Sequence, residues 1–116
     1  MTRRSANDSN MPAIGTLHQL LCAAIGERRL VEFSSKRCQR VGEPHDYGVK
    51  DGVRKLLYYQ IAGQSNSAPP TGWRWADTDE ISGARILEGR FAGPRPAPSG
   101  RHVKWDKLFA SVYQKG

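Results

Sequence analysis

The sequence predicts a mainly β domain with flanking helices, in which an N-terminal helix packs on a five-stranded antiparallel sheet curled into a small barrel. Three observations favour this fold class. Apolar residues follow a helical period near the start of the chain, and strand-like runs come next, separated by turn signals about every 8 to 12 residues. The length of 116 residues is enough for one domain and not for two.

The predicted helix begins at Ile14, and its apolar residues recur three or four positions apart, so that they share one helix face. Gly26 is expected to end the helix, because glycine adopts the left-handed conformation of a helix C-terminus at little cost. The apolar face consists of Ile14, Leu17, Leu20, Leu21, Ala24 and Ile25.

Five extended runs follow, at 28–34, 38–49, 53–63, 72–77 and 84–91. They are bounded by residues typical of turns, and the run at 53–63 is the richest in β-prone residues. The polar segment 34–37 separates the first two strands, and Asp51-Gly52 is a strong signal for a tight hairpin. The segment 78–83 before the last strand predicts a tight turn with a single helical turn.

The chain is expected to divide into a disordered leader (1–12), a barrel domain (13–91), a linker rich in Pro and Gly (92–102) and a C-terminal amphipathic helix (103–116). Apolar residues at helical spacing predict the last helix, and they are Trp105, Leu108, Phe109 and Val112. This helix is expected to dock on its own barrel, with docking on a partner as the alternative.

Composition limits the function classes. No run approaches the about 20 apolar residues that a membrane-spanning helix needs, and the start lacks an export signal. The two cysteines lack CxxC spacing, which predicts neither a zinc site nor a disulfide framework. We therefore expect a cytoplasmic protein without membrane attachment, metal or cofactor. The net charge of +7 favours anionic partners such as nucleic acid or nucleotides.

Short motifs from Ile14 to about Phe91 occur in an order typical of one family. They are Val31-Glu32-Phe33, Arg40 with Glu43-Pro44-His45, Tyr47-Gly48, Leu57-Tyr58-Tyr59, Trp73-Arg74 and Asp79-Glu80-Ile81. In this order they resemble a WYL domain, an Sm-like or SH3-like barrel found in bacterial regulators and phage-defence systems. The resemblance implies a ligand-sensing module, here a stand-alone single-domain member, because about 13 residues before the first helix leave no room for a helix-turn-helix.

Two features depart from the family pattern. The Trp-Tyr-Leu triplet is absent, and the corresponding strand contains Leu-Leu-Tyr-Tyr-Gln at 56–60. The end of the following strand is acidic, with Asp77, Asp79 and Glu80, where the family usually carries a basic residue.

The segment Glu-Pro-His-Asp at 43–46 allows three interpretations. A histidine oriented by a carboxylate is the chemistry of acid–base catalysis or metal binding. A metal site needs three or four converging ligands, however, and His18 and His102 lie on a helix and in a linker. Glu43 and His45 share one side of a strand, so they either brace the segment through hydrogen bonds, which we favour, or contact a bound phosphate or base.

Aromatic side chains interleaved with cations on strands suit single-stranded nucleic acid, because rings stack on bases and arginine binds phosphate. In the strand at 53–63, Leu57 and Tyr59 are expected inside, which leaves Tyr58 and Gln60 on the polar face.

In the strand at 72–77, Trp73 and Trp75 are expected in the core, so Arg74 points outward. No P-loop, dinucleotide fingerprint, zinc pattern or nucleophile with its base occurs in the sequence, so we expect no catalytic residues and no enzyme activity.

The sequence therefore predicts a non-catalytic binding or sensing module of a bacterial regulatory or defence system, which binds nucleic acid or a nucleotide through a basic, aromatic-bearing face. The expected ligand contacts are Arg40, His45, Tyr47, Tyr58, Gln60 and Arg74. An electrostatic arm that contacts phosphates without sequence specificity is expected from Arg95, Arg101, Lys104 and Lys107. The alternative is a protein-interaction or oligomerisation module, joined to a partner or a second copy through edge strands or the C-terminal helix.

Overall fold

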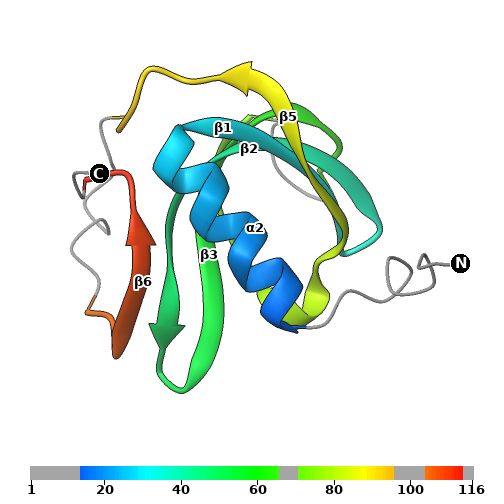
Figure 1. Cartoon of the computed structure of the whole chain (residues 1–116). Helices are drawn as coiled ribbons and strands as arrows, with labels where there is room; N and C mark the ends of the chain where they lie inside the picture. Colours follow the sequence, from blue (N-terminus) through cyan, green and yellow to red (C-terminus); the bar gives the residue numbers. More distant parts are fainter. Residues whose placement is uncertain (1–13, 66–70, 96–103, 114–116) are drawn as a thin grey trace, which may run out of the picture.

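The computed structural model describes residues 14–65, 71–95 and 104–113, and within them the chain forms a six-stranded antiparallel sheet and one α-helix (Figure 1). The elements are helix α2 (Ile14–Glu27), strands β1 (Arg29–Ser35), β2 (Cys38–Lys50), β3 (Val53–Gly63) and β4 (Gly72–Asp77), the 3-10 helix η1 (Thr78–Glu80), and strands β5 (Ser82–Arg90) and β6 (Lys107–Ser111). The mainly β class and the N-terminal helix are thus confirmed. The predicted leader 1–12 and the linker beyond Arg95 lie outside the described residues. No helix among the described residues is long and apolar enough to cross a lipid bilayer.

Backbone torsion angles show where the helix and the hairpins turn. Helix α2 continues through Gly26 to Glu27, and the left-handed residue that follows it is Arg28, with a φ of 56°. The prediction that Gly26 would take this conformation was therefore wrong by two residues. The hairpin between β2 and β3 is as predicted, because Asp51 and Gly52 both have positive φ, at 53° and 78°.

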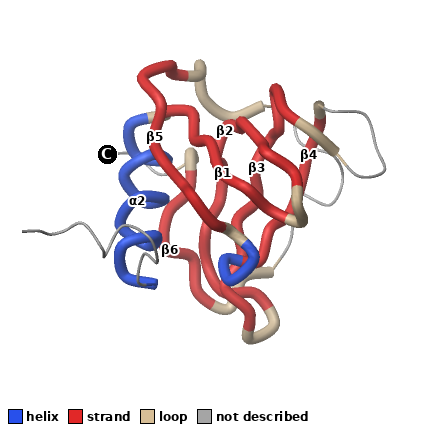
Figure 2. Tube along the Cα trace, turned by 90° about the vertical axis from the view of Figure 1, so that its right-hand side faces the viewer, coloured by secondary structure: helices blue, strands red, loops and turns tan. Residues whose placement is uncertain are grey.

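Strand β2 organises the sheet, whose order is β4-β3-β2-β1-β5. One edge of β2 pairs with β3 over residues 40–50. The other edge is shared, since β1 pairs with residues 38–42 and β6 with residues 46–49. Figure 2 shows α2 along one side of the sheet and β4 at its far end. The sheet is not closed into a barrel: β4 and β5 are the two ends of the strand order, with no pairing between them in the described chain.

The hydrophobic core lies between α2 and the concave face of the sheet. Leu21 and Ile25 of α2 are at most 2% exposed, as are Val31 and Phe33 of β1. Each such side chain contributes about 1.5–3 kcal/mol through its burial. Farther toward β4, the concave face becomes polar, because the residue that pairs with Phe33 on β2 is Arg40.

The C-terminal segment forms a strand, so the prediction of an amphipathic helix over 103–116 was wrong, and five strands become six. Strand β6 pairs with β2 from Asp46 opposite Ser111 to Val49 opposite Lys107. That edge of β2 is left unpaired by β1, and its N–H and C=O groups need partners. Gly48 permits the approach of β6, because a Cβ at this position would collide with the carbonyl oxygen of Lys107.

The strand faces predicted for β3 and β4 are inverted. Tyr58 and Gln60, expected on the outside, are 1% and 0% exposed on the concave face, whereas Tyr59 is only partly buried on the outer face. Trp75, expected in the core, is 40% exposed. Gly42 favours this arrangement, because its missing side chain leaves room for the ring of Tyr58 across the sheet.

Candidate anion-binding site

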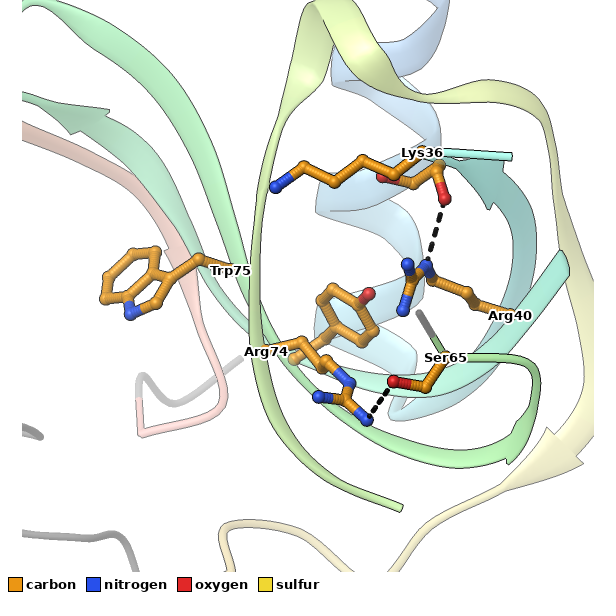
Figure 3. Close-up of a pocket in the computed structure, with 7 residues that line it drawn as sticks. Lys36, Arg40, Ser65, Arg74 and Trp75 are labelled. Carbon is orange, nitrogen blue, oxygen red and sulfur yellow. Dashed lines mark hydrogen bonds between the residues drawn. The ribbon is translucent and has the colours of Figure 1, made fainter. Parts of the chain in front are cut away.

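A pocket of about 150 Å³ opens on the polar part of the concave face. Its lining comes from the β1–β2 turn, from β2, from β3 and the residues after it, and from β4: Ser35, Lys36, Arg40, Tyr58, Ser65, Arg74 and Trp75. Three of these described lining residues are cations and none is acidic. In Figure 3, Arg40 and Arg74 point into the pocket from opposite walls, and Trp75 points away from them. The pocket is therefore a positively charged recess.

Arg40 is the most buried cation of the pocket, with only 5% of the residue exposed. Its Nε donates a hydrogen bond to the carbonyl oxygen of Ser35 at 3.2 Å, and its Nη1 donates to Oε1 of Gln60 at 3.0 Å. No carboxylate of the described residues forms an ion pair with it. A buried charge is costly unless an opposite charge accompanies it, so a nearby anion would stabilise Arg40 in this position.

Gln60 fixes the two guanidinium groups relative to one another. Its Oε1 accepts from Arg40 and also from Nε of Arg74, at 3.4 Å, while its own amide donates to the carbonyl oxygen of Gln64 at 2.9 Å. Arg74 also donates from Nη2 to Oγ of Ser65 at 3.1 Å. The neutral carboxamide of Gln60 thus orients both guanidinium groups, which preorganises the pocket.

Tyr58 forms an apolar wall beneath the two arginines. Its ring packs edge-on against Phe33, with ring centroids 5.1 Å apart. Burial raises the pKa of the Tyr58 phenol above its ordinary value, while the positive charges of Arg40 and Arg74 act in the opposite direction. The phenol is therefore protonated near neutral pH, and it can donate a hydrogen bond but cannot act as a base.

The β1–β2 turn contains Lys36, the third cation of the pocket lining, and its neighbour Arg37. Lys36 and Arg37 form a two-residue hairpin loop in which both have positive φ, at 52° and 66°. This backbone favours Asn-Gly, and residues with long side chains adopt it at a cost of about 1–2 kcal/mol each. The chain accepts strained backbone here to carry two positive charges, which is a pattern typical of functional sites.

The predicted ligand residue His45 lies outside the pocket, in a cluster on the outer face of the sheet. Its ring is fully buried, and Nδ1 donates to the carbonyl oxygen of Glu43 at 2.8 Å, while Nε2 accepts from the backbone N–H of Arg95 at 3.3 Å. Rings of Trp73 and Phe91 pack against it at 4.7 and 5.5 Å. Burial lowers the pKa of His45, which is neutral in this arrangement. These contacts match the bracing role that the sequence favoured.

Arg95 belongs to the same outer-face cluster. Its guanidinium binds both carboxylate oxygens of Glu43, at 2.6 and 3.0 Å, and lies over the ring of Tyr59 at 4.0 Å. Glu43 raises the pKa of Arg95, whose charge is thus neutralised within the protein. Of the other residues predicted to form an arm, Lys104 and Lys107 are exposed, Lys107 lies on β6, and Arg101 is outside the described residues. Arg95 is therefore not a free phosphate contact, while the role predicted for Lys104 and Lys107 stays a prediction.

Tyr47 lies in a third place, beneath α2. Its hydroxyl contacts Nδ1 of His18 at 2.9 Å and accepts from Nη1 of Arg54 at 3.1 Å, and its ring packs on Phe109. Burial raises the pKa of Tyr47. The structure therefore brings Arg40, Tyr58, Gln60 and Arg74 together, and it separates Tyr47 and His45 from them.

Lys36 and the two serines were not among the predicted ligand residues. A sequence signal for Lys36 does exist, because a two-residue loop between strands that contains Lys-Arg in place of Asn-Gly is unusual. Ser35 and Ser65 carry no comparable signal. No group of three or more His, Cys, Asp or Glu residues within the described ranges is arranged to hold a metal ion, and neither Cys22 nor Cys38 forms a disulfide.

Comparisons with known proteins add no further assignment: no family model, no curated protein and no solved structure matches this chain.

Proposed function

We propose that this protein is a binding module for a phosphate-bearing ligand, a nucleotide or a nucleic acid, which it holds in the basic pocket without altering it. The observation that carries this proposal is Arg40, a cation with 5% exposure whose described partners are neutral oxygens. A phosphate oxygen between Arg40 and Arg74 would supply the missing negative charge. Hydrogen bonds between guanidinium and phosphate are about twice as strong as those between neutral groups.

The surroundings of Arg40 support an anion as the ligand. Lys36 and Arg74 add two positive charges, and no acidic side chain lines the described pocket to compete with a ligand. The β1–β2 turn places the exposed Lys36 in the pocket lining, and the charge of Lys36 and that of the adjacent Arg37 raise the local concentration of anions.

Binding without catalysis fits the chemistry of the lining. Phosphoryl transfer needs an activated nucleophile or a metal ion beside the phosphate. The pocket offers guanidinium, ammonium and hydroxyl groups, and the pKa of its phenol, Tyr58, is raised. The described lining includes no carboxylate, imidazole or thiol that could serve as a general base.

Fluorescence anisotropy with a 3′-labelled oligothymidylate that carries a 5′-phosphate tests the proposal. At low salt the wild-type protein is expected to bind it, and Arg40→Leu is expected to bind about 10- to 100-fold more weakly, because charge-assisted hydrogen bonds are lost. Arg85→Gln is the matched control. It also removes one positive charge, but from a side chain on β5 that is 69% exposed and pairs with Glu32 away from the pocket.

Equal weakening in both variants would show that the net charge attracts the probe and that the pocket does not. Absence of binding by the wild-type protein at low salt would contradict the proposed function altogether. Thermal unfolding of Arg40→Leu accompanies the titration, and we expect a small change in the midpoint, because removal of the buried charge offsets the loss of its hydrogen bonds to Ser35 and Gln60.

A second candidate function, protein interaction or self-association, has its own observation. Trp75 on the edge strand β4 is 40% exposed and packs beside Trp105, with ring centroids 5.7 Å apart. A tryptophan pair with one exposed ring, next to a strand edge with which no described strand pairs, is a suitable joining surface. Light scattering of the wild-type protein and of Trp75→Ser tests this candidate: a dimer that dissociates on substitution supports it, and a wild-type monomer contradicts it.

Membership of the WYL family remains part of the same proposal. The order of one helix followed by antiparallel strands, with Arg40 and the Glu43-Pro44-His45 segment on β2, agrees with the resemblance in sequence. In this proposal the curled, open sheet is a variant of the small barrel of that family, and the chain serves a bacterial regulatory or defence system as its ligand-binding part.

A further inference from the structure

We infer that the pocket selects a terminal phosphate, a phosphomonoester, over the phosphodiesters inside a nucleic-acid strand. The inference rests on the proposed function and adds the chemical group that the pocket recognises. Either a free nucleotide or the phosphorylated end of a strand carries this group.

The first argument is size. The pocket holds about 150 Å³, whereas pockets that enclose a whole organic ligand measure about 300–1,000 Å³. A phosphoryl group with its oxygens fits this space, and a complete nucleotide does not. The sugar and base of any nucleotide ligand must therefore remain outside.

The second argument is depth. The exposure of the three cations decreases inward: Lys36 is exposed, Arg74 is partly buried, and Arg40 is 5% exposed (Figure 3). A phosphate has to enter the recess to bind Arg40. A terminal phosphate hangs on one ester bond and can enter with three oxygens directed at the arginines. An internal phosphodiester carries a sugar on each side, and both sugars would have to enter with it.

The third argument is charge. A phosphomonoester has a second pKa of about 6 and is mostly a dianion at pH 7, whereas a phosphodiester carries a single charge. Three cations line the pocket, and its described lining includes no carboxylate. Coulomb attraction grows with the charge of the ligand, and it is stronger beside a buried group than in open water. A dianion therefore gains more from this pocket than a monoanion does.

The test compares two oligothymidylates in anisotropy titrations of the wild-type protein. One ends in a 5′-phosphate, and the other is one nucleotide longer and ends in a 5′-hydroxyl, so both carry the same number of phosphates. We expect the 5′-phosphorylated strand to bind about 10-fold or more tightly, and Arg40→Leu to remove this preference. Because the comparison is made on the wild-type protein, it does not depend on how any variant folds.

A competition experiment separates the two sources of the group. Thymidine 5′-monophosphate is expected to displace the labelled strand, and its methyl ester, a phosphodiester of nearly the same size, is expected to fail. Displacement by the ester as effective as by the monophosphate overturns the inference. Equal binding of the two strands with loss in Arg40→Leu also overturns it, while the proposed function stands. If neither strand nor nucleotide binds, both proposals fail.

Discussion

Two arginines contact β2 on opposite faces of the sheet, and their hydrogen-bond acceptors differ. On the outer face, Arg95 binds both oxygens of the Glu43 carboxylate at 2.6 and 3.0 Å. On the concave face, Arg40 donates to the carboxamide oxygen of Gln60 at 3.0 Å and to a backbone carbonyl. The first cation is neutralised by its own chain and fastens the segment after β5 to the sheet. The second keeps its full charge, which makes it suitable for a ligand.

The contrast shows that a count of basic residues does not locate a binding site. Arg95 was expected to be a free phosphate contact, and it is committed to Glu43. What distinguishes the two regions is a single functional group, a carboxylate in one and a carboxamide in the other. Gln60→Glu gives Arg40 a carboxylate, and Glu43→Gln takes the carboxylate away from Arg95. Each variant therefore tests whether this one group accounts for the difference between the two arginines.

The largest effect is expected from Gln60→Glu. The new carboxylate would lie about where Oε1 now accepts from Arg40 and Arg74, at 3.0 and 3.4 Å, so a ligand would compete with an internal counter-ion. We expect affinity for the 5′-phosphorylated strand to fall about 100-fold, and the free energy of unfolding not to fall. Anisotropy and urea denaturation measure the two quantities. Gln64→Glu, on an exposed residue, is the control for added negative charge. A similar loss of affinity in this control would contradict the proposal that the ligand binds in the pocket.

The reverse exchange, Glu43→Gln, is expected to act on stability. The side chain of Glu43 is 8% exposed, and that of its partner Arg95 is 41% exposed, so water compensates for part of the lost ion pair. We expect urea denaturation to show a loss of about 1–2 kcal/mol with no change in ligand affinity. Glu27→Gln breaks an exposed pair with Arg29 and should cost less than about 0.5 kcal/mol. Equal effects in the two variants would assign Glu43 no special role.

A smaller effect is expected from replacing the strained turn by Lys36→Asn with Arg37→Gly. Both residues have positive φ, which Asn and Gly tolerate well, so the protein should gain about 1 kcal/mol of stability. Affinity should fall about 3- to 10-fold, because one cation of the pocket and its neighbour are lost. Lys36→Gln removes charge without relieving the backbone, and it should weaken binding without stabilising. If the double variant binds as tightly as the wild-type protein, the β1–β2 turn is not part of the binding site.

The smallest effect concerns pH and the outer-face cluster. Burial lowers the pKa of His45 below its ordinary value of 6.5, with Glu43 and Asp46 opposing this shift and Arg95 adding to it. Between the two pKa values the unfolded chain binds more protons, so stability is complete above about pH 6.5 and decreases as pH falls below it. Urea denaturation between about pH 5.5 and 7.5 should show this slope in the wild type. A slope of the same size in His45→Gln would assign it to other groups.

Local signals in the sequence predicted those parts of the fold that depend on residues adjacent in the chain. The Asp51-Gly52 hairpin and the extended runs that became β1 and β3 need only a few adjacent residues to be recognised. Strand β6 could not be found this way, because Trp105, Leu108, Phe109 and Val112 fit a helical period equally well. What decides between the two is the open edge of β2 at residues 46–49, which lies far away in the chain. The pattern of apolar residues in one segment carries no information about an unpaired edge on a strand far away in the sequence.

The same difference between local and long-range effects explains which features of the site could be predicted from the sequence. Arg40, Gln60 and Arg74 meet because they occupy neighbouring positions on paired strands, and strand alternation places such residues on one face. Their face was predicted wrongly, since Leu57 and Tyr58 are both buried and alternation alone gives no direction there. The register of β2 against β3 shifts between Pro44 and Asp46, which is a property of the assembled sheet.

The shared edge of β2 also matters while the protein is being made. Residues 46–49 lie without a partner on that edge until residue 111 has been synthesised, which takes several seconds at about 5–20 residues per second. During this interval the nascent chain shows a row of free N–H and C=O groups, to which other strands can add. A chain that stops early, or is cut before β6, keeps this edge exposed permanently. Strand β6 thus covers an edge of the sheet that a copy truncated before residue 107 leaves open.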